Sequence, residues 1–75
     1  MTWKRLVLDC VKDLCEKKGS EVFVLNEIYE YEYQMSLKYP RNHTIKEKIR
    51  QSLQYLRDDG FIEFIDNKGY YRLLK

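Results

Sequence analysis

The sequence predicts an α+β fold in which three helices are combined with a small three-stranded antiparallel sheet. Apolar residues recur at helical spacing in three segments, residues 3–18, 27–39 and 45–58. Three shorter segments rich in β-branched and aromatic residues predict strands, and they are residues 21–25, 61–65 and 70–74. Because 44% of the 75 residues are hydrophobic, we expect one small domain over residues 1–75 rather than a disordered tail.

The first helix has clear signals at both ends. Thr2 is placed to cap a helix that begins at Trp3. Lys17 and Lys18 put positive charge in the last turn, and Gly19 is suited to end the helix. The apolar stripe expected to face the core consists of Trp3, Leu6, Val7, Cys10, Val11 and Leu14.

The second helix carries two apolar stripes. We expect Asn26 to cap it, and we expect it to end at about Tyr39 because Pro40 disfavours helix in the residue before it. One stripe, expected to face the core, consists of Ile28, Tyr31, Met35 and Tyr39. The other stripe is predicted to be an exposed patch for a partner domain or a second copy, unless it too is buried, and it consists of Tyr29, Tyr33 and Leu37.

The third helix begins after a polar turn. Thr44 and Glu47 have the spacing of a capping box, which predicts a helix from Ile45. Gly60, after two aspartates, predicts its end. The predicted buried stripe is Ile45, Ile49, Leu53 and Leu56, with Ser52 among them.

The last two strands form a predicted hairpin. Residues 66–69, Asp-Asn-Lys-Gly, join them in a turn, and the first short strand is expected to pair with this hairpin. Ile62, Phe64, Tyr71 and Leu73 are expected to face the core. The order helix, strand, helix, turn, helix, strand, strand is that of a winged helix-turn-helix, with the hairpin as its wing.

The net charge of +2 hides a basic block. Residues 38–57 contain six basic residues against one acidic residue, a net of +5, whereas the rest of the chain has a net of −3. Such a block indicates a polyanionic partner, and the alternative is an ordinary solvated helix. We find no apolar run long enough to span a membrane and no signal peptide, so a cytoplasmic protein is expected.

Catalytic or metal chemistry is not indicated. Cys10 and Cys15 lie about 140° apart on a helix, too divergent for a disulfide, so we expect reduced thiols in the core. Two cysteines and one distant histidine do not make a metal site. His43 has no neighbouring nucleophile or carboxylate signalled in the sequence, so no enzymatic activity and no cofactor are expected.

Residues 23–74 resemble the C-terminal winged-helix domain of the Dam-replacing and DpnI-type restriction endonucleases. The matching pieces are FVLNEIY at 23–29, YP at 39–40, KIRQSLQYLRDDGFIEF at 48–64 and GYYRL at 69–73. The resemblance covers about two thirds of the chain, and its most specific part is the run from Lys48 to Gly60. It implies a reader of N6-methyladenine within GATC in double-stranded DNA, whose nuclease chemistry belongs to a separate domain. The turn at residues 40–43 has fewer asparagines than is usual in that family.

The third helix has the layout of a DNA-reading helix. At about 100° per residue, Glu47, Gln51 and Gln54 lie opposite the core stripe, with Arg50 at the edge. Gln can pair with adenine and Arg with guanine, while lysines on the flanks meet phosphates. The predicted DNA-binding residues are Arg41, Asn42, His43, Thr44, Lys46, Lys48, Arg50, Gln51, Gln54 and, at the wing tip beside Asn67, Lys68.

Several alternatives stay open. The winged helix could serve protein–protein contact through Tyr29, Tyr33 and Leu37, or it could bind DNA without preference for methylation. Lys68 could be a plain turn residue, and so could His43. Trp3 is expected to pack in the core.

Overall fold

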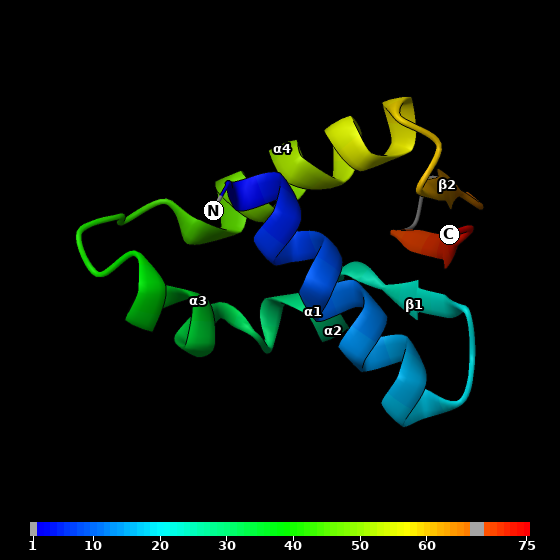
Figure 1. The fold of residues 1–75 in the computed structure, drawn as a ribbon, viewed down its shortest axis with the longest axis horizontal. Coiled ribbons are helices and arrows are strands. Elements are labelled where there is room, and N and C mark those ends of the chain that lie inside the picture. Colours follow the sequence, from blue (N-terminus) through cyan, green and yellow to red (C-terminus); the bar gives the residue numbers. More distant parts are fainter. Residues whose placement is uncertain (1, 67–68) are drawn as a thin grey trace.

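The structure, a computed structural model, describes residues 2–66 and 69–75, and it is an α+β winged helix (Figure 1). Four helices are combined with a small three-stranded antiparallel sheet, which lies at one side of the molecule and joins β1 to the two C-terminal strands. The elements are α1 (Trp3–Lys18), β1 (Val22–Val24), α2 (Leu25–Tyr29), α3 (Glu32–Lys38), α4 (Ile45–Asp58), β2 (Ile62–Phe64) and β3 (Tyr70–Leu73). The predicted strand centres are confirmed, and each strand is one or two residues shorter than expected.

The first helix forms as predicted. The Thr2 hydroxyl oxygen accepts a hydrogen bond from the Arg5 N–H at 3.2 Å, and Gly19 ends the helix in the left-handed region at φ 67°. Both cysteines are buried and free, which confirms the prediction of thiols in the core. Burial, together with the nearby carboxylate of Asp13, raises the pKa of Cys10 to about 11, so this thiol stays protonated.

The predicted second helix is in fact two helices. The chain leaves the helix at Glu30 and Tyr31, so that α2 and α3 are separate. The Tyr31 hydroxyl donates a hydrogen bond to the Asp13 carboxylate on α1, at 2.8 Å. This contact joins distant parts of the chain and stabilises the break between α2 and α3. Helix propensity depends on local sequence and therefore could not predict it.

The cap expected at Asn26 is also wrong. The helix α2 begins two residues earlier than expected, at Leu25, and Val24 is its N-cap. The carboxylate of Glu27 accepts the Val24 N–H at 2.9 Å and pairs with Lys18 Nζ at 2.8 Å. Glu27 therefore accepts a backbone N–H at the start of α2, and its ion pair with Lys18 links this start to the end of α1.

The helix α4 begins at Ile45 and ends at Asp58, as predicted, but without the expected capping box. The Thr44 side chain does not cap the helix. Instead the Thr44 N–H and hydroxyl both donate to the Asn42 side-chain oxygen, at 2.9 and 3.1 Å. The predicted buried stripe of α4 is confirmed, and it packs mainly against α1.

The sheet has the strand order β1-β3-β2, which confirms that the first strand pairs with the hairpin. Glu63 lies opposite Arg72, and the two side chains form an ion pair at 2.8 Å. Phe64, expected in the core, is 40% exposed, because it lies at the end of the edge strand β2. The predicted wing tip, Asn67 and Lys68, lies outside the described residues.

The core joins α1, α4 and the inner face of the sheet. Ile28 and Met35 from the second predicted helix are fully buried in it, whereas Tyr31 and Tyr39 are partly buried. The Trp3 ring stacks on Tyr39 with the ring centroids 4.5 Å apart, so Trp3 packs within the fold as expected. Among residues 2–66 and 69–75, none of the helices is both long and apolar enough to cross a membrane.

Candidate nucleic-acid interface

The outer face of α4 gathers much of the predicted DNA-binding set. Helical spacing places these side chains opposite the buried stripe, and most of them are exposed. They surround one shallow hollow, whose lining residues are Thr44, Glu47, Lys48, Arg50, Gln51 and Gln54. The Gln51 amide nitrogen lies 3.4 Å from the Tyr55 hydroxyl, a weak contact that leaves the amide near the hollow.

The cations of the basic block differ from those of the rest of the chain in their partners. On α1, Arg5 pairs with Asp9 at 3.2 Å and Lys17 pairs with Asp13 at 3.0 Å. In the block only Arg57 forms an ion pair within the part of the chain that the structure describes, with Asp58 at 3.2 Å. The block cations without such a pair there are Lys38, Arg41, Lys46, Lys48 and Arg50.

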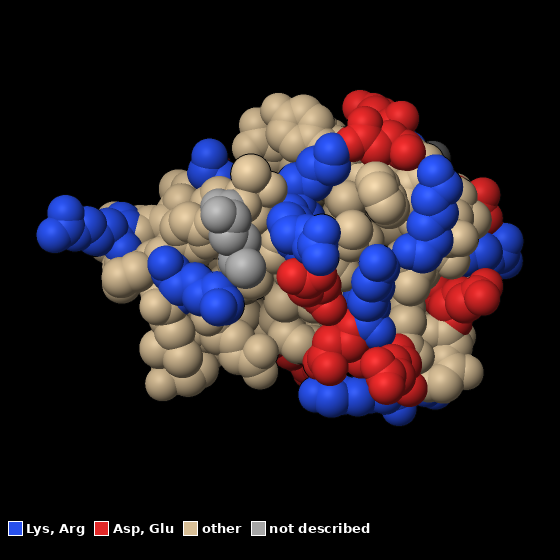
Figure 2. All heavy atoms as spheres, viewed as in Figure 1, with Lys and Arg blue, Asp and Glu red and all other residues tan. Residues whose placement is uncertain are grey.

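Figure 2 shows the same contrast on one face of the molecule. Acidic and basic side chains are interleaved over the part that holds α1 and the sheet. The opposite end, where the α3–α4 turn protrudes, carries only Lys and Arg among its charged side chains in this view. Cations that form no ion pair among the described residues remain available to a polyanion, and Glu47 is the one acidic residue of the block.

The turn between α3 and α4 exposes Arg41 and His43 beside the start of α4. Asn42 is partly buried, and its side-chain oxygen is already used by Thr44, so only its amide nitrogen is left to contact a ligand. No hydrogen bond or ion pair to His43 is found among the described residues. The turn is thus held in shape by Asn42 and Thr44, and it presents the other two side chains outward.

One flank of α4 faces aromatic side chains of other elements. Lys46 Nζ lies 5.4 Å from the centroid of the Tyr29 ring on α2. The Arg57 guanidinium lies 4.6 Å from the centroid of the Phe64 ring on β2. Such cation–π contacts hold long side chains in place without neutralising them. Lys68, the remaining predicted contact, lies outside the described residues.

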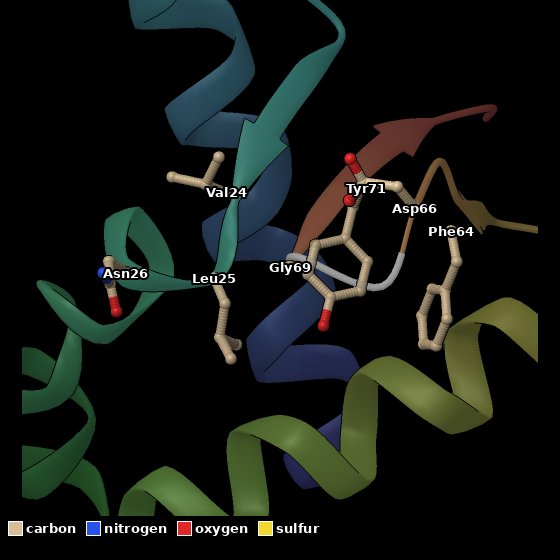
Figure 3. Close-up of a pocket in the computed structure, with 7 residues that line it drawn as sticks. All are labelled: Val24, Leu25, Asn26, Phe64, Asp66, Gly69 and Tyr71. Atoms are coloured by element: carbon tan, nitrogen blue, oxygen red, sulfur yellow. The ribbon is translucent and has the colours of Figure 1, made fainter.

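A second hollow, which the sequence did not indicate, lies between the sheet, the start of α2 and the segment that follows β2 (Figure 3). Its lining residues are Val24, Leu25, Asn26, Phe64, Asp66, Gly69 and Tyr71. The strand alternation predicted Tyr71 as a core residue, and its ring is indeed buried. No sequence signal could show that the hydroxyl at the end of this ring reaches a hollow, because that depends on how three separate elements meet.

The second apolar stripe is divided by the break at Tyr31. Tyr29, on α2, is partly buried beneath Lys46. Tyr33 and Leu37, on α3, are 73% and 65% exposed. The expected continuous patch of three residues is therefore wrong, and the exposed part is the pair Tyr33 and Leu37. Within residues 2–66 and 69–75, no cluster of His, Cys, Asp and Glu is arranged to hold a metal ion.

Comparison with known families agrees with this architecture. The family model described as the Dam-replacing HTH domain matches residues 1–73. The resemblance seen in the sequence is therefore confirmed, and it extends further than residues 23–74. It includes α1, whose sequence carried little of the resemblance, because α1 supplies the core surface on which α4 packs.

Proposed function

The chain belongs to the Dam-replacing HTH domain family, and from that premise we propose that it binds double-stranded DNA in a sequence-specific manner. In this proposal α4 enters the major groove and reads N6-methyladenine in a GATC-like site. The observation that carries the proposal is the outer face of α4. There, amide side chains lie among cations that form no ion pair with a carboxylate of the described residues.

The side chains around α4 suit two different tasks. Gln51 and Gln54 can each bond to the N6 and N7 edge of adenine, and Arg50 can bond to guanine. The proposed base contacts are Asn42, His43, Thr44, Arg50, Gln51 and Gln54. Cations on the flanks and in the turns can meet phosphates, which position the protein without specifying sequence. The proposed phosphate contacts are Arg41, Lys46, Lys48 and Lys68.

The methyl group itself offers a physical basis for discrimination. In GATC the two adenines lie at adjacent steps on opposite strands, so both N6 positions open into one stretch of major groove. Methylation keeps N7 as an acceptor, leaves one N6 hydrogen and adds an apolar group. Burying one methyl contributes about 0.8 kcal/mol. Two methyls would then favour the fully methylated duplex by ~1.6 kcal/mol, or about fifteenfold.

A direct test compares three duplexes that differ only in methylation. Fluorescence anisotropy at one salt concentration should give the tightest binding for fully methylated GATC, intermediate binding for the hemimethylated duplex and the weakest for the unmethylated duplex. A scrambled duplex of the same composition is the control for sequence. Equal affinity for the methylated and unmethylated GATC duplexes would reject the methyl reading and leave DNA binding as such intact.

A second candidate function is protein–protein contact, and the exposure of Tyr33 and Leu37 favours it. The two side chains lie on α3 and do not line the hollow on α4, so we expect that a partner could bind there whether or not DNA is bound. Replacing both with serine should abolish such contact and leave DNA affinity unchanged. Analytical ultracentrifugation of wild type and variant would detect self-association, and loss of DNA binding in the variant would contradict the separation of the two surfaces.

A further inference from the structure

The hydroxyl of Tyr71 has no internal partner among the described residues. Tyr71 is only 8% exposed, yet no hydrogen bond to its hydroxyl is found within residues 2–66 and 69–75. The same part of the chain contains no buried side-chain oxygen or nitrogen that lacks a partner. The Tyr71 hydroxyl must therefore reach solvent, and it does so in the hollow that Tyr71 lines.

The ring of Tyr71 is held on two sides, which fixes the direction of this hydroxyl. Phe23 stacks on the ring with the centroids 5.3 Å apart. Phe64 meets it edge-on with the centroids 4.8 Å apart. Figure 3 shows the hydroxyl end of the ring directed toward α4 rather than toward the outer face of the sheet. An ordered hydroxyl of this kind loses little conformational entropy when it binds a ligand.

The charges around this hydroxyl suit an anion. Burial, and to a smaller extent Tyr29, raises the pKa of Tyr71, while Arg50 lowers it. The phenol therefore stays protonated at neutral pH and can donate a hydrogen bond. Lys46 and Arg50 lie one helical turn apart on the flank of α4, and neither forms an ion pair within the described residues.

The position of Lys46 indicates where an anion can lie. Asp66, from the segment that follows β2, lines the hollow together with Phe64. Lys46 lies over the Tyr29 ring of α2. An anion is therefore favoured between Tyr71 and α2.

We propose that the Tyr71 hydroxyl, together with Lys46, forms a seat for one phosphate of the DNA backbone at the junction of β3, α2 and α4. The inference rests on the proposed duplex binding, and it adds a contact from the sheet to those of the reading helix. The Tyr71 hydroxyl donates one hydrogen bond to a phosphate oxygen, and Lys46 supplies the charge, while Arg50 adds positive potential from its place one turn along α4. Tyr29 acts as a positioning residue, because its ring holds Lys46 beside the seat.

The test uses Tyr71→Phe, which removes only the hydroxyl and keeps the ring in the core. This variant should bind every duplex about tenfold more weakly, methylated or not, because the lost bond is to a charged group that carries no sequence information. Its salt dependence should equal that of wild type, because a neutral hydroxyl releases no counterion. Lys46→Ala should instead make the slope of log K against log salt less steep by about 0.9.

Tyr33→Phe is the matched control, since it removes a hydroxyl from an exposed tyrosine on α3. It should bind as wild type does. A thermal melt of Tyr71→Phe should match that of wild type, because no internal hydrogen bond is lost. A folded Tyr71→Phe variant whose affinity for the duplex is within twofold of that of wild type would contradict the proposed phosphate seat. If wild type binds no duplex at all, the proposed function fails and the seat fails with it.

A second measurement locates the phosphate. Single methylphosphonate substitutions in the duplex neutralise one phosphate at a time. At the seated phosphate, neutralisation should weaken wild type more than it weakens Tyr71→Phe, because the hydrogen bond from the hydroxyl to a charged oxygen is already absent in the variant, whereas the contact with Lys46 is lost in both. Additive losses at every position scanned would overturn the proposal.

Discussion

Gln51 and Lys46 lie on different sides of α4, and in the proposed complex this difference separates contact with bases from contact with phosphates. Gln51 lines the hollow opposite the core, whereas Lys46 lies on the flank over Tyr29. A side chain opposite the core meets the floor of the groove, where the base edges are. A side chain on the flank meets the walls, where the phosphates are.

Substitutions at these two positions should therefore have different signatures. Gln51→Ala is expected to cost about 1–3 kcal/mol of binding free energy at the cognate site and to relax sequence preference. Lys46→Ala should weaken all duplexes alike. Competition binding against a panel of single-base variants of the site distinguishes the two. The same loss of preference in both variants would contradict the assignment of roles.

The lowered pKa of Asp13 predicts that the stability of the fold depends on pH. Hydrogen bonds from Lys17 and then from Tyr31 lower the pKa of Asp13 in the folded protein. A lowered folded pKa adds stability that is fully present above the unfolded aspartate value of about 3.9 and is lost as pH falls through the folded value. Urea unfolding should therefore show wild type more stable than Asp13→Asn at neutral pH, with the gap closing in acid. A gap that stays constant down to pH 2 would contradict this account.

The helix boundaries show which signals act locally. Thr2 and Gly19 bound α1 where the sequence predicted, because each acts on backbone groups within its own turn. The buried stripes of α1 and α4 were also predictable, since helical periodicity and burial coincide when one face packs on the core. On α4, the same periodicity placed Gln51 and Gln54, the proposed reading residues, on one face.

The errors arise where a polar side chain takes a partner that periodicity does not specify, one of them distant in sequence and two of them local. Tyr31 leaves the helix while its hydroxyl bonds to Asp13 of α1. Glu27 moves the start of α2 by accepting the Val24 N–H. Thr44 turns to Asn42 instead of forming a capping box. Each of these polar side chains had two available partners, and periodicity carries no information about which partner it takes.

A substitution at Gly19 tests whether the left-handed conformation of this residue is needed to end α1. Its φ of 67° is unfavourable for residues with a Cβ, although no atom lies within 4 Å of the Cβ that alanine would add. Gly19→Ala should therefore destabilise the fold by about 1–2 kcal/mol through backbone strain alone. Lys12→Ala, at an exposed position on the same helix, is the control and should change stability by less than about 0.5 kcal/mol. Equal unfolding midpoints in urea for Gly19→Ala and wild type would show that the end of α1 rearranges.

In the whole molecule, the packed core and the cations without an ion pair lie in different regions. The core lies between α1, α4 and the sheet, and the ion pairs of α1 neutralise its surface. The α3–α4 turn and the outer side of α4 keep their cations unpaired within the described residues. A chain with a net charge of only +2 thus has one strongly basic side. Charge patterning along the sequence predicted this asymmetry, but only the fold shows which cations are paired.

The salt dependence of duplex binding tests this central claim most directly. Each phosphate neutralised by a cation contributes about −0.9 to the slope of log K against log salt. With six basic residues in the block, we expect a slope of roughly −3 to −6 for wild type on a GATC duplex, measured by anisotropy over a range of salt concentrations. A slope near zero would contradict an electrostatic DNA interface and would favour the protein-contact function instead.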